Sequence, residues 1–256
     1  MKDPRNPSGE PRIENRIPDP ANVKVNATTG NNPAIDTRTG IQNTPDPSRP
    51  AGEPVLMPNQ DKPFNNDHFV AEEFLKLKGK FNVEVAIELG TCVGGTTKWM
   101  AENFEEVHTI EINETFLGFA IQRCAGLSNI AFYLGSTVNR LAEVLSVSVP
   151  ETFDDQLLGS NMLIFIDSHW NTLPIFDELK IIKASGLKPV IAIHDFLVPE
   201  EPKLGFDSYE GVDISFENIK KFIDDIYGED GYEYHYNSDD TSTEVKRGLI
   251  YIYPKK

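Results

Sequence analysis

The stretch Ile87-Glu88-Leu89-Gly90-Thr91-Cys92-Val93-Gly94-Gly95-Thr96 decides the fold of this chain. The apolar residues 83–87 predict a short strand that leads into it. The first glycine permits a tight turn, and the Gly-Gly pair lets the backbone approach a ligand before a helix begins. Because the first N–H groups of a helix have no internal partner, that helix start suits a polar or anionic group. The stretch therefore predicts a strand, a ligand-binding turn and a helix.

Strand and helix patterns continue to alternate after this turn. We expect strands at 83–87, 107–111, 130–134, 162–166 and 190–193, and helices at 67–78, 96–103, 113–124, 137–145, 174–185 and 215–227. Two further strands, 232–236 and 248–253, are joined by a polar loop without a helix and must pair antiparallel. The fold class is therefore α/β: a doubly wound, mostly parallel seven-stranded sheet with a C-terminal antiparallel hairpin.

The first predicted helix has two further expected features. Phe69, Phe74, Leu75 and Leu77 are available to face the core. Gly79 is expected to end the helix.

Residues 1–62 differ in composition from residues 63–256. Twelve of the 18 prolines lie in the first 63 residues. The first aromatic residue of the chain is Phe64. Such a segment buries too little apolar area to offset its ordering entropy. We predict an extended N-terminal arm of low intrinsic order at 1–62 and one globular domain at 63–256.

The charge of the chain follows the same division. Residues 1–62 contain eight basic and eight acidic residues, so the whole net charge of −16 falls on the domain. An acidic domain repels phosphate backbones and lacks the basic stripe of nucleic-acid binders. We expect no nucleic-acid and no membrane partner, since no apolar run approaches the roughly 20 residues of a bilayer span. The expected location is cytoplasmic, or virion-associated, because no signal-peptide core begins the sequence.

A carboxylate at the end of the second strand completes the first candidate site. Glu111 follows the glycine turn by about 20 residues, where it can accept hydrogen bonds from both ribose hydroxyls of a nucleotide-like ligand. A plain turn without a ligand, or an exposed strand-end carboxylate, remains the alternative. Dinucleotide binding is a rival, although the G-x-G-x-x-G fingerprint is absent.

Four polar residues follow the fourth and fifth strands: Asp167, His169, His194 and Asp195. Since neighbouring parallel strands end on the same rim, these side chains are expected to converge. Asp167, His194 and Asp195 could hold a divalent cation such as Mg²⁺, and His169 or His194 could act as a general base. The alternatives are a helix-capping carboxylate and ordinary strand-end histidines. Cys92 is expected to have no catalytic role, because nothing near it in sequence activates a thiol.

These motifs resemble those of class I S-adenosylmethionine-dependent methyltransferases. Glu-Leu-Gly-Thr, Gly-Gly-Thr, Ile-Asp-Ser-His and Ile-His-Asp are most similar to the small-molecule O-methyltransferase and cephalosporin-hydroxylase-like branch. The resemblance covers about residues 64–256 and implies a Rossmann-like methyltransferase fold with S-adenosylmethionine as cofactor. It implies cofactor contacts at Glu88, Gly90, Thr91, Gly94, Gly95, Glu111, Ser136 and Asp167, and catalytic roles for Asp167, His169 and His194.

The chain departs from this pattern at two places. An acidic residue common in relatives near Ser136 is missing, and His194 stands where metal-dependent relatives have an oxygen donor. We also expect Trp170 and the loop 196–213 to border the substrate pocket, where the prolines and glycines of the loop suit a lid; a plain surface loop is the alternative.

The expected function is methyl transfer to an oxygen of a small molecule, with possible assistance from a divalent cation. A different class remains open: an assembly or interaction protein on a methyltransferase-like scaffold, forming a homo-oligomer or larger complex through residues 1–62. Hydroxylation by a histidine- and Asp-bound iron is a third reading.

Overall fold

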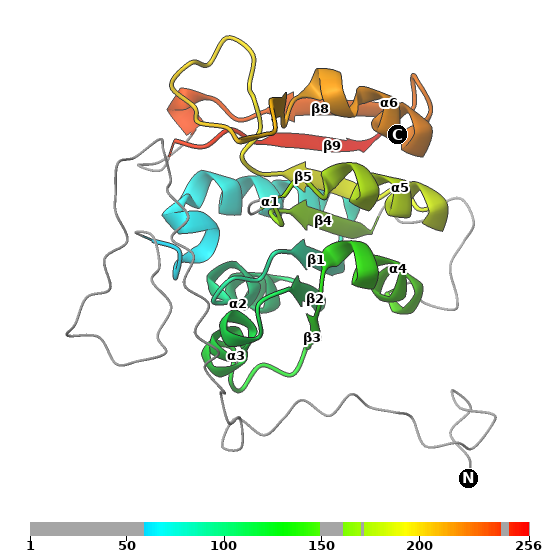
Figure 1. The fold of residues 1–256 in the computed structure, drawn as a ribbon. Helices are drawn as coiled ribbons and strands as arrows, with labels where there is room; N and C mark the ends of the chain where they lie inside the picture. The colour runs from blue at the N-terminus through cyan, green and yellow to red at the C-terminus, as the bar shows by residue number, and fades with distance from the viewer. Residues whose placement is uncertain (1–58, 149–160, 170–171, 242–245, 256) are drawn as a thin grey trace. The chain divides into compact units, whose positions relative to one another are not determined.

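The computed structural model describes residues 59–148, 161–169, 172–241 and 246–255 (Figure 1). The predicted arm therefore lies outside the described residues, except for its last four positions. Trp170 and the center of the loop before β9 lie outside them too.

A seven-stranded sheet forms the center of the domain, in the order β3-β2-β1-β4-β5-β9-β8. The strands are β1 (Val85–Leu89), β2 (Glu106–Glu111), β3 (Ile130–Leu134), β4 (Met162–Ile166), β5 (Val190–Ile193), β8 (Tyr232–Tyr236) and β9 (Ile250–Pro254). β1 to β5 pair parallel, whereas β9 pairs antiparallel with both β5 and β8. The predicted fold class and the closing hairpin are confirmed.

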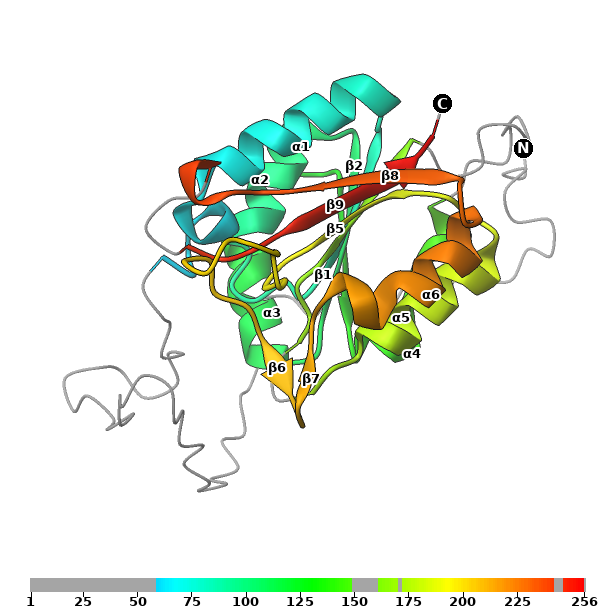
Figure 2. The same ribbon diagram turned by 90° about the horizontal axis from the view of Figure 1, so that it is seen from above.

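Helices cover both faces of the sheet (Figure 2). One face carries α1 (His68–Phe81), α2 (Gly95–Asn103) and α3 (Glu114–Arg123), and the other carries α4 (Thr137–Val147), α5 (Ile175–Ser185) and α6 (Phe216–Tyr227). Alternate residues of the central strands divide between two hydrophobic cores, with Ile164 and Ile166 in one and Leu163 and Phe165 in the other. This alternation explains why β4 is a continuous apolar run.

The first helix differs from its predicted form. Gly79 lies inside α1, which continues to Phe81 and ends at Asn82, whose φ is 52°. Asparagine tolerates this left-handed conformation, so it replaces glycine as the terminating residue. The buried stripe is Val70, Phe74, Leu77 and Phe81, and Leu75 is exposed, because the helix turns a different face to the sheet.

The segment before α1 packs against the start of α2. A 3-10 turn, η2 (Pro63–Asn66), buries Phe64 against Phe74, Trp99 and Phe165, with ring centroids 4.9, 5.0 and 5.6 Å away. The Phe64 N–H donates to Thr96 Oγ1 at 2.9 Å. The first residues of the predicted domain are thereby fixed beside the glycine turn.

The loop after β5 contains a short ribbon that the sequence did not predict. β6 (Ser208–Tyr209) and β7 (Val212–Asp213) pair antiparallel. Glu210 and Gly211, which join them, have φ values of 52° and 81°. Two positive φ values are what a two-residue type I′ hairpin requires.

None of the helices among the described residues combines the length and apolar character that a membrane span needs.

Candidate functional site

The switch point of the sheet lies between β1 and β4, because the chain winds outward from β1 in both directions. Ligands of open α/β sheets bind beyond the carboxyl ends of the strands at this point. The segments that follow β1 and β4 are close together at this point, since a Cβ on Gly90 would lie 2.3 Å from the Asp167 carbonyl oxygen. The φ of Gly90 is +99°. Both the backbone conformation and the lack of space require glycine.

Packing against neighbouring parts of the chain explains why residues 94 and 95 are both glycine. A Cβ on Gly94 would lie 2.8 Å from Ala120 of α3, and one on Gly95 would lie 2.8 Å from the backbone of Asp61 and Lys62. Arg123 joins these parts, since its Nε donates to the Val93 carbonyl and its Nη1 donates to the Asp61 carbonyl. Close approach of protein backbone thus accounts for glycine at 94 and 95 without a ligand.

Glu88 lies beneath the turn and does not face solvent. Its Oε2 accepts hydrogen bonds from Thr97 at 2.5 Å and Thr109 at 2.6 Å. Burial raises the pKa of Glu88 to about 8, although the two threonine hydroxyls oppose this shift. Thr91 contacts Thr109 in the same buried group. These residues support the turn from below.

Glu111 joins the turn to the end of β2. Its Oε2 accepts from the Cys92 N–H at 2.8 Å, and its Oε1 accepts from the Asn113 N–H at 2.8 Å. Burial raises the pKa of Glu111, while these backbone donors lower it. Glu88 contacts Thr109, two residues before Glu111 on β2, so both carboxylates lie on the same face of the sheet. The glycine turn after β1 and Glu111 at the end of β2, which the sequence analysis combined in one site, are therefore in direct contact.

Two exposed apolar residues beside Glu111 were missed by the sequence analysis. The side chain of Ile112 is 73% exposed, and Leu134, the residue that pairs with Glu111 from β3, is 40% exposed. Gly135 donates its N–H to the Glu111 carbonyl at 2.8 Å, which places Ser136 next to this surface. Isolated exposed apolar residues carry no signal in the sequence, and only the pairing of β2 with β3 places Leu134 beside Glu111.

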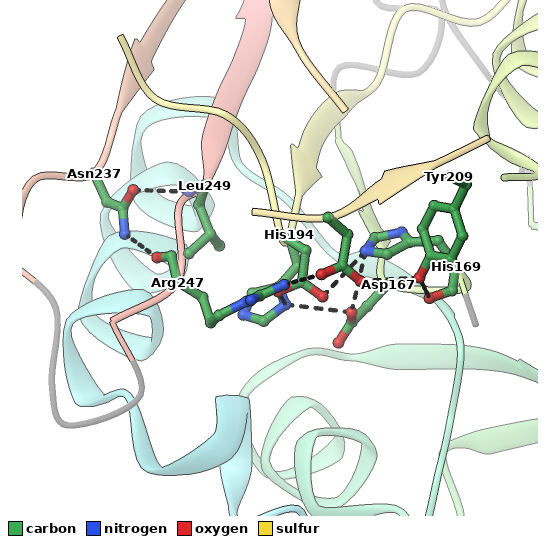
Figure 3. A network of polar contacts seen from close by, with 9 residues as sticks. Asp167, His169, His194, Tyr209, Asn237, Arg247 and Leu249 are labelled. Carbon is green, nitrogen blue, oxygen red and sulfur yellow. Dashed lines mark hydrogen bonds and ion pairs between the residues drawn. The ribbon is translucent and has the colours of Figure 1, made fainter. Parts of the chain in front are cut away.

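The second constellation forms at the ends of β4 and β5, as expected (Figure 3). His169 Nε2 lies 3.2 Å from Asp195 Oδ2, and His194 Nδ1 lies 3.3 Å from Asp167 Oδ1 and 3.1 Å from Asp195 Oδ1. The Asp167 side chain is 29% exposed, whereas those of His169 and His194 are 1% and 6% exposed. Asp167 is thus the member of the three predicted catalytic residues that solvent reaches.

Three residues that the sequence analysis did not select complete this cluster. Arg247 donates from Nε to Asp195 and from Nη2 to Asp207. The Tyr209 hydroxyl lies 2.9 Å from Asp207 Oδ2 and 2.7 Å from the His169 carbonyl oxygen. The φ of Asp195 is 55°, an unusual value for a non-glycine residue that the surrounding contacts hold in place.

The charges in the cluster compensate one another. Burial lowers the pKa of His194, but the carboxylates of Asp195 and Asp167 outweigh it and raise this pKa well above its usual value. The pKa of His169 is raised in the same way, mainly through Asp195. Burial raises the pKa of Asp195, and His194, His169 and Arg247 together hold it well below its usual range.

The donor set also fits a divalent cation. Asp167, His194 and Asp195 each offer a ligand atom within 4.8 Å of the others, and so do His169, Asp195 and Asp207. His194 Nδ1 is buried and makes no hydrogen bond of acceptable geometry, although it points at the carboxylate oxygens. Two carboxylates with one imidazole suit a transition metal at least as well as Mg²⁺, which prefers oxygen ligands alone.

Cys92 has no catalytic environment. Burial raises the pKa of its thiol to about 11, so the reactive thiolate is scarce at neutral pH.

Comparison with solved structures gives many distant likenesses. An O-methyltransferase from Bacillus cereus in complex with SAH shares 20% identity over 80% of this chain and 84% of its own, with a TM-score of 0.47. The O-methyltransferase TomG from Streptomyces achromogenes, involved in tomaymycin synthesis and solved with SAM, shares 16% identity over 73% and 80%, with a TM-score of 0.46. An rRNA methylase from Streptococcus thermophilus shares 12% identity over 80% and 100%, with a TM-score of 0.46.

No family model matches the chain, and no curated protein matches its sequence. The structural likenesses are too distant to assign an activity or an acceptor. The Rossmann-like methyltransferase fold rests on the strand order, and the function rests on the site itself.

Proposed function

We propose that the domain binds S-adenosylmethionine at the turn 88–95 and Glu111, and transfers its methyl group to an oxygen of a small molecule. The observation that carries the proposal is the hydrogen bond from the Cys92 N–H to Glu111 Oε2. It fixes a strand-end carboxylate against the turn at the switch point of the sheet, where ligands of such folds bind.

Glu111 retains capacity for a ribose. Each of its oxygens accepts one backbone N–H, and a carboxylate offers about four acceptor positions in total. The exposed side chains of Ile112 and Leu134 would provide apolar surface for the adenine ring, with Ser136 beside them.

The cluster at Asp167 supports transfer to a hydroxyl. The cofactor supplies an electrophilic methyl group on a sulfonium, so transfer forms one C–O bond, breaks one C–S bond and releases one proton. Asp167 is the exposed group that can take this proton, and the carboxylates of the cluster raise the pKa of the buried His169 and His194 behind it. Positioning of the acceptor hydroxyl would contribute most of the rate enhancement.

The proposal also includes a divalent cation that would assist the transfer. Asp167, His194 and Asp195 would hold it, and the observation that favours it is that His194 Nδ1 lies 3.3 and 3.1 Å from the two carboxylates without a hydrogen bond to either. A bound cation would lower the pKa of the acceptor hydroxyl. Arg247 competes for Asp195, so the cation must bind in the presence of a neighbouring guanidinium.

The acceptor is proposed to be a small molecule because the domain carries the whole net charge of −16. A nucleic-acid acceptor would be repelled by this charge, particularly at low salt.

Isothermal titration with S-adenosylhomocysteine tests the proposal. Glu111→Ala should weaken binding at least tenfold, Glu111→Gln should weaken it less, and Glu114→Gln, an exposed carboxylate at the start of α3, should bind as the unmodified protein does. Absence of binding at millimolar ligand, or equal affinity of Glu111→Ala, would contradict the proposed function.

A further inference from the structure

A pocket of about 760 Å³ lies between the loop that follows β5 and the start of α6. Its walls include the apolar side chains of Leu197, Val198, Leu204, Phe206 and Phe216. Figure 2 shows the loop and the first turn of α6 on either side of the β6–β7 ribbon. The volume is within the range of small-molecule sites, which are mostly apolar with a few polar groups.

Backbone hydrogen bonds preform the walls. The Leu197 N–H donates to the Ile214 carbonyl at 2.7 Å, and the Asp207 N–H donates to the Asp195 carbonyl at 2.9 Å. The Gly205 N–H donates to the Lys246 carbonyl at 2.7 Å. The loop 196–213 is therefore held at three points by the segments next to β5, β9 and α6, which argues against a freely hinged lid.

The pocket is joined to the Asp167 cluster through these walls. Leu197 is two residues beyond Asp195, and Phe206 directly precedes Asp207. Asp195 and Asp207 are the two carboxylates that Arg247 holds together. A molecule in the pocket would thus lie close along the chain to the groups proposed to act on the acceptor.

Four carboxylates line the pocket without a cationic partner among the described residues: Glu200, Glu201, Asp213 and Glu217. The nearby Lys203 forms its ion pair with Asp239 at 2.7 Å, and Glu201 acts on it only through its charge. The start of a helix favours acidic residues, which accounts for Glu217 in the first turn of α6 but not for Asp213, which ends β7. Glu200 and Glu201 lie on the loop, so the helix does not account for them.

A buried hydroxyl also lines the pocket. Ser215 is 9% exposed and occupies the N-cap position of α6, but its side chain makes no capping hydrogen bond. Because it makes no capping bond, this hydroxyl can accept a hydrogen bond from a ligand in the pocket.

We propose that this pocket binds an amphipathic amine, with the apolar body against Leu204 and Phe206 and the ammonium group among the four carboxylates and Ser215. The inference rests on the proposed function and deepens it, since the amine would be the part of the acceptor that is recognised, while a hydroxyl of the same molecule receives the methyl group. Charge complementarity in a preformed apolar pocket selects such a ligand against neutral and anionic molecules of equal size.

Three probes of matched shape test this inference: 4-phenylbutylammonium, 4-phenylbutanol and 4-phenylbutyrate. Their binding to the protein saturated with S-adenosylhomocysteine would be measured by isothermal titration at low salt and again at high salt. The ammonium should bind at least tenfold more tightly than the alcohol, the carboxylate should bind most weakly, and high salt should reduce the difference.

Two double variants locate the binding. Glu201→Gln with Asp213→Asn should reduce the preference for ammonium over alcohol to about twofold or less. Glu72→Gln with Glu233→Gln removes the same charge from exposed positions on α1 and β8 and should keep the preference. Circular dichroism and thermal unfolding would check that each variant is folded, and a Ser215→Ala variant with reduced ammonium affinity would give independent support.

The outcomes separate this inference from the proposed function. Equal binding of ammonium and alcohol, tighter binding of the carboxylate, or an unchanged preference in the pocket variant overturns the amine pocket while S-adenosylhomocysteine binding persists. Loss of S-adenosylhomocysteine binding overturns the proposed function, and ammonium selectivity that remains would then describe a pocket without a methyl acceptor role.

Discussion

Arg247 donates a hydrogen bond to Asp195, although the two residues are 52 positions apart in sequence. Asp195 follows β5, and Arg247 lies three residues before β9, which pairs antiparallel with β5. The same guanidinium bonds Asp207 in the loop after β5. One side chain therefore connects the terminal hairpin, the loop and the candidate catalytic rim.

Removing Arg247 should destabilise the domain. Arg247→Gln leaves the buried Asp195 carboxylate with less compensation, and breaking a buried ion pair costs about 3–5 kcal/mol. Because about a quarter of the Arg247 side chain is exposed, we expect about 3 kcal/mol or somewhat less in urea unfolding. Arg247→Lys keeps the positive charge but not the planar guanidinium that bonds both carboxylates. Its free energy of unfolding should therefore lie between those of the unmodified protein and Arg247→Gln. A loss below 0.5 kcal/mol for Arg247→Gln would show that the contact contributes little.

Glu88 should make stability fall with rising pH. Its folded-state pKa of about 8 is above the usual value of 4.5, so the folded protein binds this proton more tightly than the unfolded chain does. The stabilisation is therefore present below about pH 4.5 and is lost as pH rises toward 8, by an amount on the order of 4–5 kcal/mol. Glu88→Gln, which keeps an acceptor for Thr97 and Thr109, should flatten this part of the curve.

Urea unfolding at pH 5, 7 and 9 measures the effect of Glu88. Glu84→Gln, an exposed position just before β1, serves as the control and should keep the slope of the unmodified protein. A slope that Glu88→Gln does not change would mean that the carboxyl titrates normally.

Cation binding should strengthen with pH. The raised pKa of His194 means that a cation at Asp167, His194 and Asp195 must displace a proton. Affinity for Mn²⁺, measured by titration or electron paramagnetic resonance, should rise about tenfold per pH unit while one proton is released per ion. His194→Ala should weaken binding and remove the dependence on pH. Affinity that is unchanged between pH 6 and pH 8 would contradict His194 as a ligand.

Phe64 should be an anchor of the segment before α1. The ring is 3% exposed among Phe74, Trp99 and Phe165, and truncation of a buried phenylalanine costs about 3–5 kcal/mol. Phe64→Ala should therefore lower the free energy of unfolding by that amount. The control Leu75→Ala, which removes an exposed side chain of α1, should change it by less than about 0.5 kcal/mol. Similar effects of the two substitutions would show that this segment is not anchored by Phe64.

The strands and most helices could be predicted because their signals are local. The apolar run of β4 and the Asn113 cap of α3 appear in the structure where the sequence placed them. The buried face of α1 could not be predicted as well, since several apolar residues of that helix competed for it. The sheet selected Val70 and Phe81 and left Leu75 exposed.

The glycine turn illustrates a different limit. The sequence predicted that glycine was needed at 90, 94 and 95, but the reason for each depends on what lies nearby. Gly94 is required by Ala120 and Gly95 by the backbone of residues 61–62. These neighbours come from distant parts of the chain, so no local sequence pattern predicts them.

By itself, the sequence determined the doubly wound sheet, the turn with its partner Glu111, and the meeting of Asp167 with His194, because strand periodicity and parallel connection bring strand ends to one rim. Only the tertiary structure decided that Arg247, Asp207 and Tyr209 join that rim, that Leu134 pairs with Glu111, and that a pocket lined by carboxylates opens next to α6. The physical reason is that these contacts depend on the antiparallel pairing of β9 with β5, on the β2–β3 register and on the path of a long loop. Such non-local relationships leave no periodic pattern in the chain.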